Sequence, residues 1–222
     1  MLCTILGQHP DVLCHHELYN PRGVFLALDL RGSELLGEVP GRDADPMGFL
    51  ERAWRLDLGR RAVGFKMTLR QEARVLEHLL ADTSVRKIVL RRHDPLRTFV
   101  SERVAERLDQ WEVYRPEDLA VNRPRVRVDL EALRAHVTAI DAYYDELARA
   151  LCGQDVREVD HARLEELSTQ RALFQFLGVK PPDEPFIARS VRQNPAPLAA
   201  LIQDYPEFSR ALRGDPLARF LD

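Results

Sequence analysis

The stretch from Val85 to Ser101 constrains the fold of this chain more than any other. It begins with a short apolar run, Ile88-Val89-Leu90, flanked by charged residues and typical of a buried strand. Asp94 and Pro95 then mark a helix start, because aspartate caps backbone N–H groups and proline suits the first helical position. An apolar face follows at a spacing of four, formed by Leu96, Val100, Val104 and Leu108. The pattern predicts a strand followed by an amphipathic helix, as in α/β folds.

Basic and hydroxyl side chains gather at this strand-to-helix junction. Arg91 and Arg92 lie where the strand ends, which is where open α/β sheets bind ligands. Arg97 and Ser101 are four residues apart and therefore share one face of the helix. Arginines, a helix N-terminus and a hydroxyl together suit a phosphate group. The alternative interpretation is a cationic strand end with a solvated helix.

The spacing of Arg92 and Ser101 resembles the 3′-phosphate-binding element of sulfotransferases that use 3′-phosphoadenosine-5′-phosphosulfate (PAPS). The continuation Arg107-Leu108-Asp109-Gln110-Trp111 is similar to the bacterial carbohydrate and lipid branch of that family, which includes nodulation-factor and trehalose sulfotransferases. Phe174 to Val179 is similar to a helix end in the same family. The resemblance implies a P-loop-NTPase-like, three-layer α/β fold with a mostly parallel central sheet flanked by helices. It also implies a single sulfotransferase-like domain over residues 1–222.

The first residues resemble the segment that follows the phosphosulfate loop in this family. Their spacing predicts a helix over Leu2–Leu6, stopped by Gly7 to Pro10, and then a strand over Val12–Cys14. In relatives a glycine- and serine/threonine-rich loop connects the first strand to this helix. Neither that strand nor that loop is found in the sequence, so we expect a sheet without its first strand.

Candidate catalytic residues lie at two strand ends. The resemblance matches Glu17 to a carboxylate near the acceptor hydroxyl, which can act as a general base if burial raises its pKa. His16 or His15 can do the same at an ordinary pKa. Lys66, in a Gly-Phe-Lys segment, resembles a family lysine near the active site and can offset charge on the sulfuryl group. The alternatives are a polar strand end and a surface lysine. A metal site is disfavoured because adjacent strand residues point to opposite faces.

The remaining pattern predicts alternating helices and strands. Residues 20–61 read as loops with a helix near Met47–Leu58, and loops this long often face a substrate. A strand over 62–67, a helix over 71–80, a helix that begins after Asp129 and a strand over 156–159 follow. Gly178 is expected to end a helix in the left-handed conformation.

Two further basic segments have open interpretations. Arg123, Arg125 and Arg127 alternate, so they form either a basic rim or a solvated edge. The tail from Arg189 to Pro195 resembles the closing segment of the bacterial branch. That resemblance makes Arg192 a candidate for the late basic loop that folds over the 3′-phosphate.

Composition excludes several classes of protein. The net charge of −3 over 222 residues argues against a general nucleic-acid binder. The three cysteines lack metal-type spacing and suggest reduced thiols in a cytoplasm. No apolar run approaches the roughly 20 residues that span a bilayer, and the first residues lack the basic flank of a signal peptide. We therefore expect a cytoplasmic protein without a transmembrane segment, and a homo-oligomer is left open.

The function that these residues favour is sulfuryl transfer from PAPS, as co-substrate, to a hydroxyl of a carbohydrate or glycolipid. Glu17 would take the acceptor proton, and Arg92 and Ser101 would hold the 3′-phosphate. A P-loop kinase is disfavoured because the eleven glycines form no Gly-x-x-x-x-Gly-Lys-Ser/Thr pattern. A dinucleotide enzyme is disfavoured because they form no Gly-x-Gly-x-x-Gly pattern either. The alternative is a truncated or degenerate relative that binds adenosine 3′,5′-bisphosphate, or a partner, without turnover.

Overall fold

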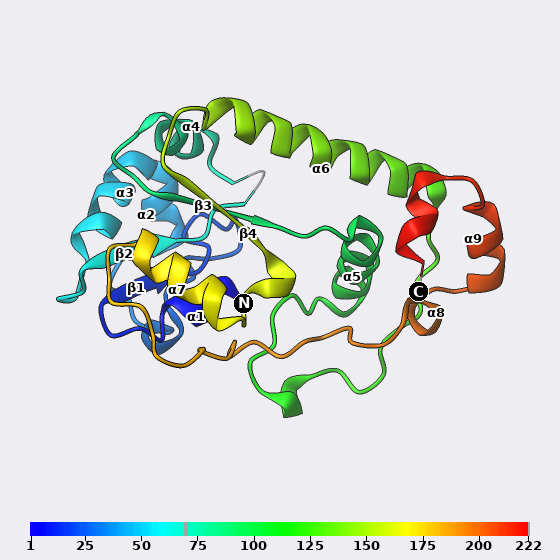
Figure 1. Cartoon of the computed structure of the whole chain (residues 1–222). Helices are drawn as coiled ribbons and strands as arrows, with labels where there is room; N and C mark the ends of the chain where they lie inside the picture. The colour runs from blue at the N-terminus through cyan, green and yellow to red at the C-terminus, as the bar shows by residue number, and fades with distance from the viewer. Residues whose placement is uncertain (69–70, 222) are drawn as a thin grey trace. The chain divides into compact units, whose positions relative to one another are not determined.

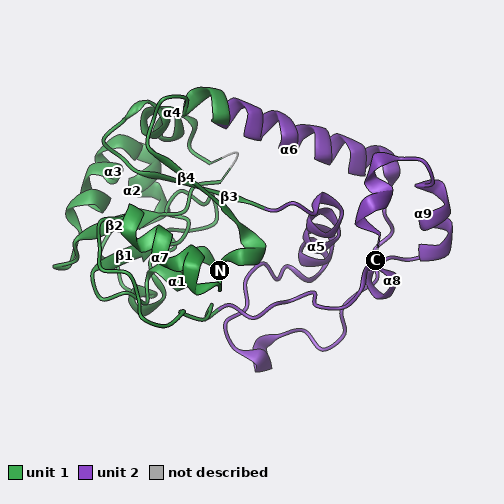
Figure 2. Cartoon of the chain, viewed as in Figure 1, with its two compact units in different colours: residues 1–91, 148–189 green, residues 92–147, 190–222 purple. Residues whose placement is uncertain are grey.

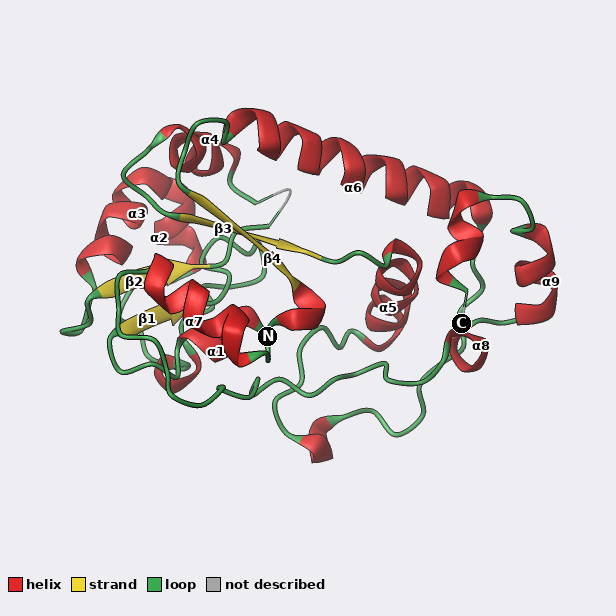
Figure 3. Cartoon of the chain, in the orientation of Figure 1, coloured by secondary structure: helices red, strands yellow, loops and turns green. Residues whose placement is uncertain are grey.

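The computed structural model describes residues 1–68 and 71–221, which form a mixed α/β structure (Figure 1). The chain divides into two compact units (Figure 2). Unit 1 comprises residues 1–91 and 148–189, and unit 2 comprises residues 92–147 and 190–222. In the described chain the strands belong to unit 1, whereas unit 2 consists of helices and connecting segments (Figure 3). None of the helices among these residues is long and apolar enough to cross a membrane.

Unit 1 contains two pairs of parallel strands. β1 (Val12–His15) pairs with β2 (Ala62–Phe65), and β3 (Lys87–Arg91) pairs with β4 (Val156–Asp160). These are the four strands that the apolar runs predict, and their parallel pairing agrees with an α/β fold. No ladder joins the two pairs within the described residues.

The helices of unit 1 agree only in part with the start and stop signals of the sequence. They are α1 (Leu2–Leu6), α2 (Val39–Ala44), α3 (Pro46–Arg55), α4 (Ala73–Ala81) and α7 (Leu167–Phe176). α3 begins at a proline, and the Asp45 side chain accepts the N–H of Gly48 at 2.9 Å. Gly178 has φ of +76°, so the predicted left-handed residue after α7 is confirmed. The sequence did not predict α2, which lies in a segment rich in proline and glycine.

Two apolar clusters hold unit 1 together. The first packs α1 and α7 against β1 and β4 through buried residues that include Ile5, Val12, Val159 and Phe174. The second includes Leu18, Tyr19, Phe49 and Val75, and it joins the segment after β1 to α3 and α4. Glu17 therefore lies between a buried strand and a buried turn, so its backbone is fixed on both sides.

Unit 2 is built from α5 (Pro95–Leu108), most of α6 (Leu130–Ala150), α8 (Leu198–Leu201), α9 (Tyr205–Ala211) and a 3₁₀ helix, η4 (Pro216–Phe220). The predicted start of α5 is confirmed, because the Asp94 Oδ1 accepts the N–H of Arg97 at 2.8 Å. Its apolar face is confirmed too, since Leu96, Val100 and Val104 are buried.

Arg125 and Arg127 are exposed, as expected of a solvated edge, whereas Arg123 is half-buried. The Arg123 guanidinium donates to Asn194 Oδ1 at 2.8 Å and to Gln193 Oε1 at 3.1 Å. Arg125 donates to the carbonyl oxygen of Ile202 at 2.7 Å. Both side chains therefore attach the C-terminal segment within unit 2, because arginine offers several donors in a rigid fork.

Candidate functional site

Glu17 directly follows β1, and its carboxylate is the centre of a polar cluster in unit 1. The Glu17 Oε1 lies 2.5 Å from Lys66 Nζ. The Glu17 Oε2 accepts hydrogen bonds from Asn20 Nδ2 and Gln71 Nε2, both at 2.7 Å. The Glu17 side chain is 18% exposed and that of Lys66 is 39% exposed. Three donors on one partly buried carboxylate fix its orientation, since bonds to charged groups are stronger than neutral ones.

The parallel pairing of β1 and β2 brings Glu17 and Lys66 together. The Lys66 N–H donates to the carbonyl oxygen of His16 at 3.0 Å, which extends the ladder by one residue beyond the strands. Carboxyl ends of parallel neighbours meet at one sheet edge, so Glu17 and Lys66, 49 positions apart in the sequence, become adjacent. Two of the predicted catalytic residues therefore form one pair.

Sequence reasoning missed two members of this cluster, Asn20 and Gln71. Asn20 forms a turn in which its Oδ1 accepts the N–H of Arg22 at 2.8 Å, and an asparagine before a proline was a signal for such a turn. Gln71 is buried, and its Oε1 accepts the N–H of Thr68 at 3.2 Å while its Nε2 binds Glu17. No local pattern distinguishes Gln71 from any other polar residue before a helix.

The two histidines beside Glu17 are both buried, but His15 does not fit the predicted role. Burial, followed by the charge of His16, lowers the pKa of His15 to about 4. Its Nδ1 accepts the N–H of Ala27 at 3.1 Å, so the nitrogen that can take a proton is already occupied. The prediction that His15 acts as a base at an ordinary pKa is therefore wrong. His16 stays a candidate.

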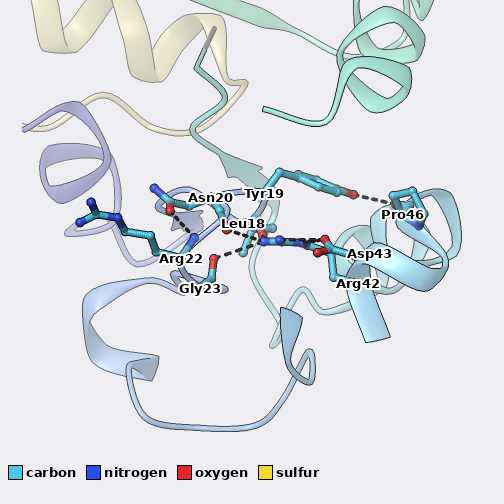
Figure 4. A network of polar contacts seen from close by, with 8 residues as sticks. All are labelled: Leu18, Tyr19, Asn20, Arg22, Gly23, Arg42, Asp43 and Pro46. Carbon is cyan, nitrogen blue, oxygen red and sulfur yellow. Dashed lines mark hydrogen bonds and ion pairs between the residues drawn. The ribbon is translucent and has the colours of Figure 1, made fainter. Parts of the chain in front are cut away.

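A cavity of about 380 Å³ lies beside this cluster and shares Gln71 with it. The cavity is lined by Tyr19, Pro21, Arg42, Asp43, Gln71, Glu72 and Ala73. Its wall depends on Arg42, whose Nη1 donates to the carbonyl oxygens of Leu18 at 2.9 Å, Asn20 at 2.8 Å and Gly23 at 3.2 Å (Figure 4). The Arg42 Nε donates to Asp43 Oδ1 at 2.8 Å.

The candidate phosphate residues lie in unit 2. Arg92 is exposed, yet the protein around its guanidinium lowers its pKa, and the charge of Glu102 opposes that effect. Ser101 and Glu102 are neighbours on α5. Arg91 belongs to unit 1, where its Nε pairs with Glu158 Oε1 at 3.0 Å across β3 and β4.

Residues 191–196 form a segment that we call the tail strap. The Val191 N–H donates to the carbonyl oxygen of Val113 at 2.7 Å, and Gln193 Nε2 donates to that of Trp111 at 2.8 Å. At the other end, Arg97 Nη1 donates to the carbonyl oxygen of Ala196 at 3.0 Å. The exposed Arg192 therefore lies on a segment held at both ends.

The predicted site residues thus fall into two sets. Unit 1 contains His16, Glu17 and Lys66, and unit 2 contains Arg92, Arg97, Ser101 and Arg192. Within each unit, the structure joins Glu17 to Lys66 and Arg97 to the tail strap. In the described residues, no group of three or more His, Cys, Asp or Glu side chains is arranged to hold a metal ion.

Comparisons of this chain with protein-family models, with curated proteins and with solved structures gave no match. Its function must therefore be argued from its own residues.

Proposed function

We propose that this protein is a sulfotransferase that transfers a sulfuryl group from PAPS to a hydroxyl of a carbohydrate or glycolipid. The observation that carries the proposal is the Glu17–Lys66 pair, 2.5 Å apart at the ends of two parallel strands. The family resemblance assigns the acceptor base and a charge-compensating lysine to these two positions. A carboxylate beside an ammonium group suits a reaction that removes a proton and develops negative charge.

In the proposed reaction the acceptor oxygen attacks the sulfur of PAPS. A new O–S bond forms while the bond from sulfur to the 5′-phosphate oxygen breaks, and adenosine 3′,5′-bisphosphate leaves. The acceptor proton passes to Glu17 as Lys66 moves from the Glu17 Oε1 towards the sulfuryl oxygens. Lys66 stabilises charge on the sulfuryl oxygens, and positioning supplies much of the rate, as in phosphoryl transfer.

The nucleotide half of the proposal involves unit 2. Arg92 and Ser101 bind the 3′-phosphate, and Arg192 on the tail strap adds a third contact. Arg97 was a further binding candidate, but its hydrogen bond to the Ala196 carbonyl oxygen and its ion pair with Asp94 at 3.7 Å favour a supporting role for it. Charge-assisted bonds from arginine suit a phosphate group.

At the level of fold, we propose a P-loop-like sheet. A single further parallel strand between β2 and β3 would join the two observed pairs into one sheet. In support, the apolar residues of β2 and β3 are only half-buried, whereas every residue of β1 is buried. Parallel strands are usually covered on both faces.

A second candidate function is nucleotide binding without turnover. It is favoured by one observation, which is that donors already occupy both carboxylate oxygens of Glu17. A base held by Lys66, Asn20 and Gln71 has little room for the acceptor proton unless Lys66 moves to the sulfuryl group.

Calorimetry with adenosine 3′,5′-bisphosphate tests the proposal. We expect Arg92→Ala and Ser101→Ala to weaken binding without unfolding the chain, the arginine change by about tenfold or more, because a bond to a charged group contributes roughly 1.5–3 kcal/mol. Arg149→Ala is the matched control, since Arg149 is exposed on α6. Unchanged affinity in both variants contradicts the assignment. Sulfate transfer to sugars by the wild-type chain distinguishes the enzyme from the non-catalytic binder.

A further inference from the structure

We infer that Cys3 and Cys14 form a buried dithiol that hydrogen peroxide oxidises, reversibly, to a disulfide within the chain. The inference goes beyond the proposed function and does not depend on it, because neither cysteine belongs to the proposed site. Both thiols are free, and both lie in the apolar cluster that packs α1 against β1. The third cysteine, Cys152, is exposed.

The packing of α1 on β1 brings the two cysteines together. Cys3 lies in α1 and Cys14 in β1, and their thiols share a hydrogen bond. Gly7, which follows α1, lies against both residues. Its N–H donates to the Cys3 carbonyl oxygen at 3.0 Å, and a Cβ at this position would lie 3.9 Å from the Cys14 carbonyl oxygen. Two thiols in hydrogen-bond contact need only a small shift to reach the S–S bond length of about 2.05 Å.

This pair differs from cysteines that pack only as small apolar side chains. The Cys14 S–H has two acceptors, which are the Cys3 sulfur and the carbonyl oxygen of His15 at 3.8 Å. Because a thiol has one proton, it bonds to one acceptor at a time. A negative charge on Cys3 favours the sulfur, since hydrogen bonds to ionised groups are the stronger ones. The contact between the thiols therefore stabilises a thiolate at Cys3.

The surroundings of the pair give its two members different roles. The hydrogen bond from Cys14 lowers the pKa of Cys3 to about 7, burial opposes this, and positive charge on His16, the terminal amino group and Lys66 lowers it further. The same hydrogen bond, together with burial, raises the pKa of Cys14 well above its usual range. The thiolate is the nucleophilic form of cysteine. Cys3 is therefore the attacking residue, and Cys14 is the residue that resolves the intermediate.

The oxidation takes two steps. The Cys3 thiolate attacks one oxygen of hydrogen peroxide, the O–O bond breaks, and hydroxide leaves a sulfenic acid on Cys3. The Cys14 sulfur then attacks the Cys3 sulfur, the S–O bond breaks, and water leaves with the Cys14 proton. The two thiols lose two electrons and the peroxide gains them, so one peroxide gives one disulfide and two waters.

The burial of the pair restricts which oxidants reach it. Cys3 and Cys14 are each 7% exposed. α1 has five residues, too few for a stable isolated helix, so its position depends on its packing and a local opening suffices to expose the thiols. Hydrogen peroxide is small and uncharged, and therefore needs a smaller opening than a disulfide reagent does.

Mass spectrometry of the Cys152→Ala chain tests the inference, because this change removes the exposed thiol. After peroxide treatment the remaining thiols are blocked with N-ethylmaleimide and the chain is cut with trypsin. Residues 1–22 form one peptide that contains both cysteines, since Arg22 is the first basic cleavage site. We expect a peptide with two labels to become an unlabelled one that is two hydrogens lighter, and dithiothreitol to restore the labels. A peptide that keeps both labels in millimolar peroxide, or that accumulates with one label, overturns the inference.

Single variants on the same background test the two roles with dimedone, which labels sulfenic acids. In Cys14→Ala the sulfenic acid on Cys3 has no resolving thiol, so we expect dimedone to label Cys3. Cys3→Ala leaves Cys14, which burial keeps protonated, and should be labelled at least several-fold less. Equal labelling of the two variants, or labelling of neither, overturns the inference.

The pH profile of disulfide formation decides the matter if either single variant fails to fold by circular dichroism. In the Cys152→Ala chain we expect the rate to rise with pH to a plateau, with a midpoint near 7, because the thiolate of Cys3 forms there. A midpoint at about 8.5, the usual pKa of a cysteine, overturns the inference.

Discussion

Replacing Glu17 by glutamine is the sharpest perturbation of the unit 1 cluster. The carboxylate accepts from Lys66 on one oxygen and from Asn20 and Gln71 on the other. A glutamine at this position has one oxygen and one NH₂ group, so it can satisfy only one of these two sides. The NH₂ group of the glutamine would then face a donor, either Lys66 or the Asn20 and Gln71 amides, and the hydrogen bond on that side would be lost. Losing one charge-assisted hydrogen bond costs about 2 kcal/mol.

We therefore expect Glu17→Gln to lower the free energy of unfolding by about 2 kcal/mol, measured by urea denaturation, while the chain still folds. If Glu17 is the general base, turnover falls by about 10² or more, because general base catalysis contributes that much. Affinity for adenosine bisphosphate should stay unchanged, since the phosphate candidates lie in unit 2.

Glu77→Gln is the matched control, because Glu77 is exposed on α4, and we expect unchanged stability and turnover for it. Turnover of Glu17→Gln within a few-fold of wild type would show that Glu17 is not the general base. If His16→Ala then abolished activity, the base would be the histidine.

Two other predictions follow from contacts outside this pair. Arg97→Met removes the bond to the Ala196 carbonyl oxygen, so trypsin should cleave the tail strap after Arg192 several-fold faster; Arg149→Met should not have this effect. His15 has a pKa of about 4 when folded, against about 6.5 when unfolded, so its contribution to stability is complete above pH 6.5 and is lost as pH falls towards 4. That contribution is about 3 kcal/mol, and His15→Asn should flatten the urea-measured stability over this window. If the unfolding free energy of His15→Asn depended on pH as steeply as that of the wild type, the low pKa assigned to His15 would be contradicted.

The sequence predicted elements whose signals are local. An apolar run gives β3 whatever its surroundings, and Asp94 before Pro95 gives the start of α5 because capping involves only the next few residues. The sequence also placed Glu17 and Lys66 at strand ends, so their pairing could have been predicted. Its geometry needed the register of β1 with β2, which no single strand specifies.

The parts that were missed depend on distant partners. Arg42 is buried because three carbonyl oxygens from the segment after β1 surround it, while its own segment reads as loop. The sequence could not separate His15 from His16 for another reason. Alternation along a strand separates a buried from an exposed face, but all four residues of β1 are buried.

The partial burial of β2 and β3 bears on both the proposed sheet and the proposed sulfuryl transfer. Val63 in β2 and Ile88, Val89 and Leu90 in β3 are apolar but half-buried. Ala62, Ile88 and Leu90 nevertheless pack against one cluster in unit 1, so both pairs share a core. One more parallel strand between β2 and β3 would cover these residues and make the sheet continuous. The carboxyl end of that strand would lie at the same edge as Glu17 and Lys66, because parallel strands place their carboxyl ends together. A phosphosulfate loop at that position would bring the donor sulfur to the pair that the structure already holds together.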